Sequence, residues 1–153
     1  MIMIKDLSKI KSLKTCFSFN SESTVSEIAD MMDLKDIGAV PIINQDNLLI
    51  GILSERDIVR KLVKTGRDSD LVTAHDIMTK EIKSVQLDTS IDEAQRIMTE
   101  NNIRHLPVVD QNHKLINFLS QRDLILSPTK KINQILMIGI SLLILITVFI
   151  IIK

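Results

Sequence analysis

A helical pattern of apolar residues begins shortly after a short apolar segment at residues 16–19. Thr24 and Glu27 stand at the spacing of a capping box, in which a hydroxyl and a carboxylate each bond a free backbone N–H at the helix start. The apolar residues around and after them recur at the spacing of one helix face: Val25, Ile28, Ala29 and Met32. This pattern predicts a short strand followed by a helix that ends near Lys35.

Two short apolar runs come next, at residues 39–43 and 48–53, with the polar segment 44–47 between them. Runs of this length around a polar turn are typical of a hairpin of two buried strands. A second helix is then expected from Ser54 to about Val63, with Ile58, Val59 and Leu62 on its apolar side. The predicted order is strand, helix, strand, strand, helix.

The same order returns 66 positions later without a gap, from Phe19 and Val85 to Arg60 and Leu126. The second copy repeats the capping box as Ser90 and Glu93, and its strands are expected at residues 106–109 and 115–119. Two related units that each leave an apolar face uncovered normally pack on one another. The predicted fold class is α/β (α+β), with two β-α-β-β-α units packed as a pseudo-twofold pair.

These patterns divide the chain into unit one, at residues 4–63, a polar linker, at residues 64–73, and unit two, at residues 74–127. Each unit has a short lead-in, at residues 4–8 and 75–79 respectively. The whole chain has 153 residues, which is about one domain's worth and enough for one proper core.

Composition changes sharply after a juxtamembrane segment, residues 128–134. Residues 135–152 carry no charge, and a helix of this length reaches roughly 27 Å, close to the thickness of the bilayer's hydrocarbon core. The alternative, a buried core helix, lacks a protein interior large enough to surround it. Because Lys130 and Lys131 precede the stretch and only Lys153 follows it, we expect a single transmembrane anchor with both units in the cytoplasm.

Charge and side-chain chemistry exclude several classes of protein. Residues 1–127 hold 16 Lys and Arg against 19 Asp and Glu, a net charge of −3, which argues against a nucleic-acid partner. The three histidines do not fall at metal-ligand spacing, and the single cysteine, Cys16, cannot form an intrachain disulfide. No Ser-His-Asp set, glycine-rich phosphate loop or catalytic carboxylate pair is present, so we predict neither a metal site nor an enzyme.

The repeated Ser-x-x-Asp, Ser54 with Asp57 and Ser120 with Asp123, lies where a strand turns into a helix. Free backbone N–H groups, a hydroxyl and a carboxylate meet there, which suits a ligand with a phosphate and a vicinal diol, such as a ribonucleotide. The same residues also form a near capping box that needs no ligand. The motif by itself leaves both interpretations open.

Taken together, the duplication, a proline in each hairpin, the segments 37–41, 103–109 and 76–79, and the two Ser-x-x-Asp corners resemble the CBS domain family. The resemblance is to a tandem CBS pair, a Bateman module, and covers roughly residues 4–127. It implies sheet-to-sheet packing with clefts that bind adenosine-containing ligands, here AMP, ADP, ATP or S-adenosylmethionine, without a required cofactor.

The resemblance also implies site residues. Asp57 and Asp123 match the aspartate that holds the ribose hydroxyls, with Ser54 and Ser120 beside them, and the strands that wall the base contain Val40, Pro41, Leu106 and Pro107.

Two differences between the units are expected to make the two sites unequal. Unit two has the cations Arg104 and His105 where unit one has Gly38 and Ala39, and Asn117 replaces Gly51 ahead of the corner, which would narrow that cleft if a ligand must approach there.

These expectations combine into a membrane-anchored regulatory module that binds an adenine nucleotide, forms a homodimer and signals to a separate effector protein. An alternative is a ligand-free scaffold for dimerisation or docking, in which both corners are only helix caps. A third is the remnant of a regulatory domain from a larger enzyme such as inosine monophosphate dehydrogenase.

Overall fold

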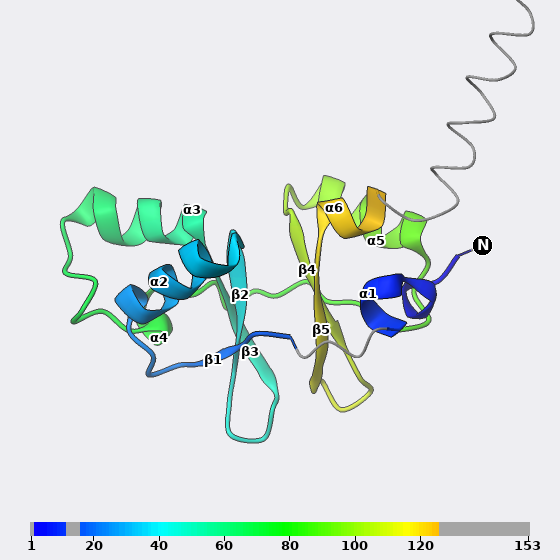
Figure 1. Ribbon diagram of the computed structural model, residues 1–153, viewed down its shortest axis with the longest axis horizontal. Helices are drawn as coiled ribbons and strands as arrows, with labels where there is room; N and C mark the ends of the chain where they lie inside the picture. Colours follow the sequence, from blue (N-terminus) through cyan, green and yellow to red (C-terminus); the bar gives the residue numbers. More distant parts are fainter. Residues whose placement is uncertain (1, 12–15, 126–153) are drawn as a thin grey trace, which may run out of the picture.

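The computed structural model describes residues 2–11 and 16–125, which form two similar halves (Figure 1). The first half contains a parallel pair, β1 with β2, and an antiparallel pair, β2 with β3. Its elements are β1 (Phe19–Asn20), α2 (Val25–Lys35), β2 (Ala39–Ile43), β3 (Leu49–Ser54) and α3 (Glu55–Asp57). A π-helical turn (Ile58–Leu62) and a 3-10 turn (Val63–Thr65) continue α3.

The second half repeats this order, with an antiparallel pair formed by β4 and β5. Its elements are α5 (Ile91–Glu100), β4 (His105–Val109), β5 (Leu115–Ser120) and α6 (Gln121–Ile125), and α4 (Ala74–Ile77) precedes them in the chain. In place of a counterpart to β1, the second half has a single parallel bridge between Val85 and Val108, which matches the pair formed by Phe19 and Ile42. The mixed α/β fold with two related units is therefore confirmed.

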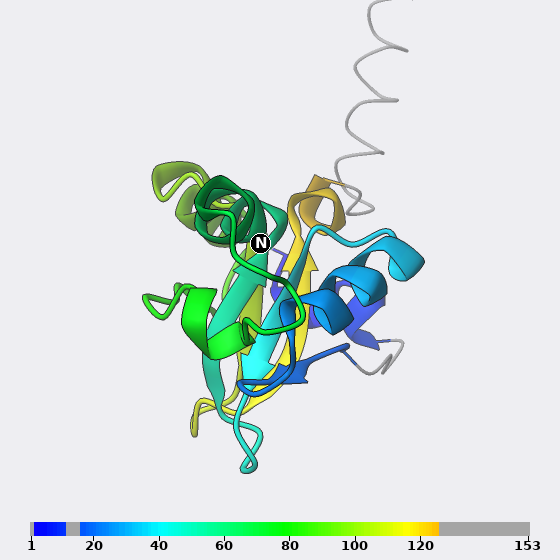
Figure 2. The ribbon, with the colours of Figure 1, turned by 90° about the vertical axis from the view of Figure 1, so that its left-hand side faces the viewer.

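The two hairpins lie side by side in the middle of the molecule, and most helices lie outside them (Figure 1). Figure 2 shows that both hairpin turns are at the same end. There the backbone of one unit bonds the other in a symmetrical way: Leu49 N–H donates to His113 O at 3.2 Å, and Leu115 N–H donates to Asn47 O at 3.0 Å. Asn47 and His113 both have positive φ values, 63° and 60°, which form the two turns.

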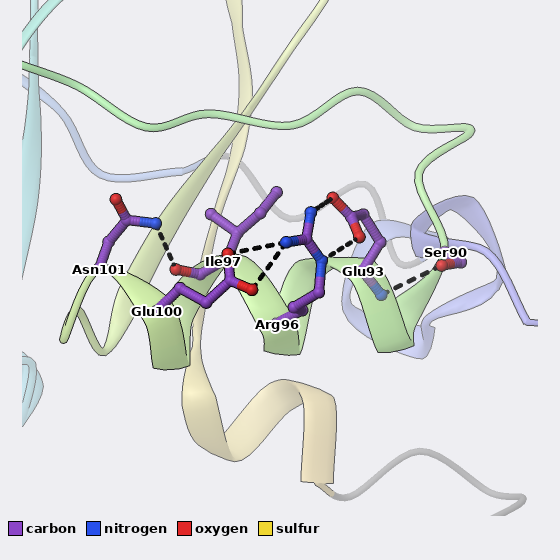
Figure 3. A network of polar contacts seen from close by, with 6 residues as sticks. All are labelled: Ser90, Glu93, Arg96, Ile97, Glu100 and Asn101. Atoms are coloured by element: carbon purple, nitrogen blue, oxygen red, sulfur yellow. Dashed lines mark hydrogen bonds and ion pairs between the residues drawn. The ribbon is translucent and has the colours of Figure 1, made fainter.

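The helix starts agree with the expected caps in one unit and only partly in the other. Thr24 and Glu27 form the complete capping box of α2. At α5, Ser90 Oγ accepts from Glu93 N–H at 3.1 Å, but the Glu93 carboxylate is turned to Arg96 (Figure 3). Two hydrogen bonds from Arg96, at 2.7 and 2.8 Å, hold Glu93 and lower its pKa below the ordinary value. The second capping box is therefore only half formed.

The expectation of one shared core is wrong, because the described residues form two hydrophobic cores, one in each half. Each core is completed by the lead-in of the other unit. Ile4 and Leu7 are buried in the second core, whereas Ala74, Ile77 and Met78 are buried in the first. A unit this small can bury only a small core by itself. The exchange adds buried apolar side chains from the other unit to each core.

Backbone hydrogen bonds hold each lead-in on the opposite unit, and the two lead-ins use equivalent donors and acceptors. Ile4 N–H donates to Thr89 O at 2.9 Å, and Ala74 N–H donates to Ser23 O at the same distance. Lys5 N–H donates to Leu87 O at 3.0 Å, and His75 N–H donates to Ser21 O at 2.9 Å. In Figure 1, blue α1 (Ser8–Lys11) accordingly lies on the side of the second hairpin, formed by β4 and β5, while green α4 lies on the side of the first hairpin, formed by β2 and β3. The chain therefore crosses between the units before each of them begins.

The helix expected from Ser54 to Val63 is present but irregular, and its apolar side is smaller than predicted. Leu62 is buried and Ile58 packs against the first core, but Val59 is 59% exposed. A π-turn places more residues in each turn than an α-helix does, so side chains within it leave the regular helical spacing. The α-helical pattern therefore placed Val59 on the wrong side.

Within the ranges that the structure describes, no helix is long and apolar enough to cross a bilayer. The predicted transmembrane stretch, residues 135–152, and the juxtamembrane segment before it lie outside the described residues.

We expect Ile4→Ala to lower the free energy of unfolding by about 2–5 kcal/mol, because it opens a cavity in the core of unit two. Amide hydrogen exchange should show the loss of protection first in β4 and β5. Lys5→Ala, at an exposed neighbouring position, should change stability by only about 0.5 kcal/mol or less. Loss of protection confined to β2 and β3 would contradict the exchange of lead-ins.

Candidate functional site

The unit-one corner, which we define as Ser54 and Asp57, lies where β3 ends and α3 begins. Ser54 has an extended backbone, and its hydroxyl accepts from Asp57 N–H at 3.3 Å. In return, Asp57 Oδ2 accepts from Ser54 N–H at 3.1 Å and from Ser54 Oγ at 2.5 Å. The corner is therefore a complete helix cap in which the carboxylate points back to the end of the strand.

The second oxygen of this carboxylate binds side chains that come from two other places. Lys61 Nζ lies 2.8 Å from Asp57 Oδ1, and Thr79 Oγ1 donates to the same oxygen at 3.0 Å. Lys61 also donates to the backbone carbonyl of Ile77 at 2.8 Å. A carboxylate offers about four lone-pair positions, and the partners of Asp57 take all of them.

The Asp57 side chain is only 12% exposed, yet its surroundings favour the charged form. Burial raises the pKa of this carboxyl, but hydrogen bonds from Lys61, Ser54 and Thr79 and the charge of Lys61 together outweigh burial and lower the pKa below its ordinary value. Asp57 is therefore an anionic acceptor at neutral pH.

The unit-two corner, Ser120 and Asp123, has the same geometry between β5 and α6. Asp123 Oδ2 accepts from Ser120 N–H at 2.7 Å and from Ser120 Oγ at 2.8 Å. The surroundings of the two corners differ in sequence. Ser127 stands 66 positions after Lys61, so the lysine that pairs with Asp57 has no cationic counterpart at that place.

The four strand residues proposed to wall a base have buried side chains. Val40 and Leu106 are fully buried in the two cores, and both prolines are buried beside them. Pro41 pairs in register with Ile52, and Pro107 pairs with Phe118. In this structure a ligand could therefore reach these segments only through their backbone.

Unit two also places an aromatic pair at the contact between the units. The rings of His105 and Phe118 are stacked, with centroids 5.6 Å apart. A Cβ atom at Gly38 would lie 3.7 Å from His105 and 3.1 Å from the carboxylate of Glu55. The small residue at position 38 therefore makes room for groups from both units, while Arg104 remains exposed.

Packing against Met78 explains why position 51 is a glycine without invoking a ligand. A Cβ atom there would lie 2.3 Å from the sulfur of Met78, so the absence of a side chain makes room for this methionine. At the matching place in unit two, Asn117 is buried and its Oδ1 accepts from Phe118 N–H at 2.8 Å. Ser8 stands 70 positions before Met78, so a smaller lead-in residue accompanies the larger asparagine.

Sequence reasoning missed Lys61, Thr79 and Phe118. Lys61 had a local signal, because an acid and a base four positions apart on a helix can pair. Thr79 had none, since it reaches Asp57 only through the exchange of lead-ins. The described residues also contain no group of three or more His, Cys, Asp or Glu side chains that could hold a metal ion.

Comparison with known proteins identifies the class to which this arrangement belongs. The family model of the CBS domain matches residues 2–64 and again residues 74–128. The chain therefore belongs to the CBS domain family, and it contains two such domains in tandem.

Three relatives illustrate the similarity. An uncharacterised protein of Methanopyrus kandleri, MK0525, is 41% identical over 102 residues, 67% of this chain and 52% of its own length. The structure of a putative signal-transduction protein with CBS domains from Burkholderia ambifaria has a TM-score of 0.71 and 34% identity, covering 80% of this chain and 87% of that one. The CBS domain pair of protein MJ0100, in complex with 5′-methylthioadenosine and S-adenosyl-L-methionine, has a TM-score of 0.70 and 25% identity, covering 81% and 93%.

The chain spans about half to three fifths of the length of the first curated relatives it matches, 52% and 60%. The activities of those longer proteins are therefore not assigned to this chain.

The lowered pKa of Asp57 predicts how stability depends on pH. The folded state holds this carboxyl at a pKa below the unfolded value of about 3.9, so its contribution is complete above that value and is lost as pH falls through the folded pKa. Urea unfolding between about pH 6 and pH 2.5 should show a smaller loss of stability in Asp57→Asn than in the unchanged protein. Parallel pH profiles for the two proteins would contradict this assignment.

Proposed function

We propose that this chain is a regulatory module that binds an adenosine-containing nucleotide between its two CBS domains. The observation that carries the proposal is the pair of Ser-x-x-Asp corners, in which a cap orients an aspartate at the start of each helix. Ribose offers two adjacent hydroxyl donors, and a carboxylate accepts both. The ligand complex of the related MJ0100 pair supports adenosine as the common part of the ligand.

AMP, ADP, ATP and S-adenosylmethionine share the adenosine that this proposal requires. Asp57 and Asp123 hold the ribose, with Ser54 and Ser120 fixing their orientation, and backbone groups of β2 and β4 meet the base. Arg104 and His105 supply donors for a phosphate beside unit two. Because no set of residues in the sequence supplies an acid-base pair or a nucleophile for catalysis, we assign regulation and not catalysis.

Regulation requires that ligand binding favours one arrangement of the module over another. The two units meet along their hairpins and exchange their lead-ins, so a ligand that contacts both would change their relative positions. The output would then pass through a homodimer or to a separate effector protein.

We further propose that residues 135–152 anchor this module in a membrane, with both units on the cytoplasmic side. Support comes from the uncharged sequence of the stretch and from the lysines that flank it, Lys130 and Lys131 before it and Lys153 after it.

One observation favours a second candidate function, a ligand-free docking scaffold. All four acceptor positions of Asp57 already have partners within the chain. Such a corner is stable as a cap without any nucleotide.

Thermal unfolding of the full chain with each adenosine compound separates these functions. A ligand at 100 times its dissociation constant adds about 2.7 kcal/mol, which raises Tm by several degrees in a domain of this size. We expect at least one compound to give such a rise, and Asp57→Ala or Asp123→Ala to abolish it. Asp30→Ala, at an exposed position on α2, is the matched control and should keep the rise. No rise with any compound would favour the scaffold.

The anchor is tested by membrane fractionation of cells that express the full chain. We expect the protein to remain in the membrane pellet after washing with alkaline carbonate, because an apolar span of this length inserts stably. Replacing Ile144 and Ile146 with lysine should release it, since charges at the centre of a span are costly. Release of the unchanged protein by carbonate would contradict the anchor.

A further inference from the structure

A lysine beside the unit-one corner has a position that suggests a second role. Lys61 is four residues after Asp57, and its side chain is 42% exposed while that of Asp57 is 12% exposed. The ammonium group has three donors and faces three acceptors: Asp57 Oδ1 at 2.8 Å, Ile77 O at 2.8 Å and Thr79 Oγ1 at 3.4 Å. We refer to Lys61 and Thr79, with their bonds to Asp57, as the latch.

The latch occupies the oxygen that a ligand would need. Asp57 Oδ2 is committed to the cap, through Ser54 N–H and Ser54 Oγ. Two hydroxyls of a ribose would therefore compete for Oδ1, which already accepts from Lys61 and Thr79. Thr79 is in turn held in place, because its backbone pairs with Ile52 through hydrogen bonds of 2.8 and 3.0 Å. Lys61, on a flexible stem, is the partner that can leave.

We propose that Lys61 is an internal competitor of the ligand at the unit-one corner and that it makes this corner selective for phosphorylated nucleotides. This inference rests on the proposed function and assigns the ligand class of one of its sites. When ribose takes Asp57 Oδ1, the Lys61 ammonium loses its carboxylate. A nucleotide phosphate returns an anion to it, and the charge-assisted bond offsets the loss.

Adenosine compounds without a phosphate return no net negative charge to the ammonium. Adenosine and 5′-methylthioadenosine are uncharged and leave it without a counter-charge. S-adenosylmethionine has one carboxylate, but its ammonium and sulfonium give it a net positive charge. The unit-one corner therefore ranks AMP, ADP and ATP above these three compounds. Lys61 is a specificity-determining residue in this account, whereas Asp57 is the residue that holds the ribose.

The test compares AMP with adenosine, which differ only by the phosphate, by calorimetric titration of the full chain. The variants are Lys61→Met, the same change in an Asp57→Ala background, and Lys64→Met as the matched control, since Lys64 is an exposed lysine on the same segment. Binding that Asp57→Ala removes is assigned to the unit-one corner.

At that corner we expect the unchanged protein and Lys64→Met to bind AMP about tenfold more tightly than adenosine. In Lys61→Met the ratio should fall to about threefold or less, chiefly because adenosine binds more tightly once its competitor is gone. A merely structural lysine would weaken both ligands together and leave the ratio unchanged.

Two results would overturn the inference while the proposed function stands: an unchanged affinity for adenosine in Lys61→Met, or a gain in adenosine binding that persists without Asp57. If no variant binds AMP or adenosine, the inference fails; the proposed function fails with it only if ADP, ATP and S-adenosylmethionine also give no rise in Tm.

Discussion

The structure depends on the exchange of the two lead-in segments. Each unit has a hairpin and a single long helix, which together leave one side of a small core open. The lead-in of the opposite unit closes that side, with Ile4 in one core and Ile77 in the other, and matched backbone hydrogen bonds hold both in place. Because each core contains residues from the lead-in of the other unit, the two repeats depend on one another although their cores are separate.

The same exchange brings the candidate site together. Thr79 reaches Asp57 because the segment that leads into unit two first passes along β3 of unit one. Met78, one position earlier, fills the space that Gly51 leaves open. Residues 77–79 thus supply both the packing against β3 and the polar contacts beside the unit-one corner. A ligand that displaces partners of Asp57 would act on the connection between the units.

Local patterns predicted most of the fold. The spacing of Val25, Ile28 and Met32 identified α2, the polar turns identified both hairpins, and the offset of 66 positions identified the duplication. These features were predictable because each depends on neighbours a few residues away. The exchange was not, since a lead-in that packs on its own unit and one that packs on the other have the same sequence pattern. Val59 was misplaced because a π-turn breaks the regular spacing on which the pattern relies.

The candidate site was predictable to the same extent. The pairs Ser54 with Asp57 and Ser120 with Asp123 were recognisable in the sequence as a repeated motif. In the structure both pairs are hydrogen-bonded at the start of a helix. The partners of Asp57 were not visible, because Thr79 is distant in sequence. Sequence also could not show that Val40 and Leu106 turn their side chains into the cores, since a buried strand and a ligand-facing strand are equally apolar.

The most direct measurement is amide hydrogen exchange of the full chain, followed by mass spectrometry, with and without saturating AMP. We predict increased protection at residues 54–58 or 120–124, where the corners lie, together with a change at residues 77–79, which contact Asp57 through Thr79. Exchange that is the same with and without the nucleotide in all three segments would contradict the claim that these corners bind it.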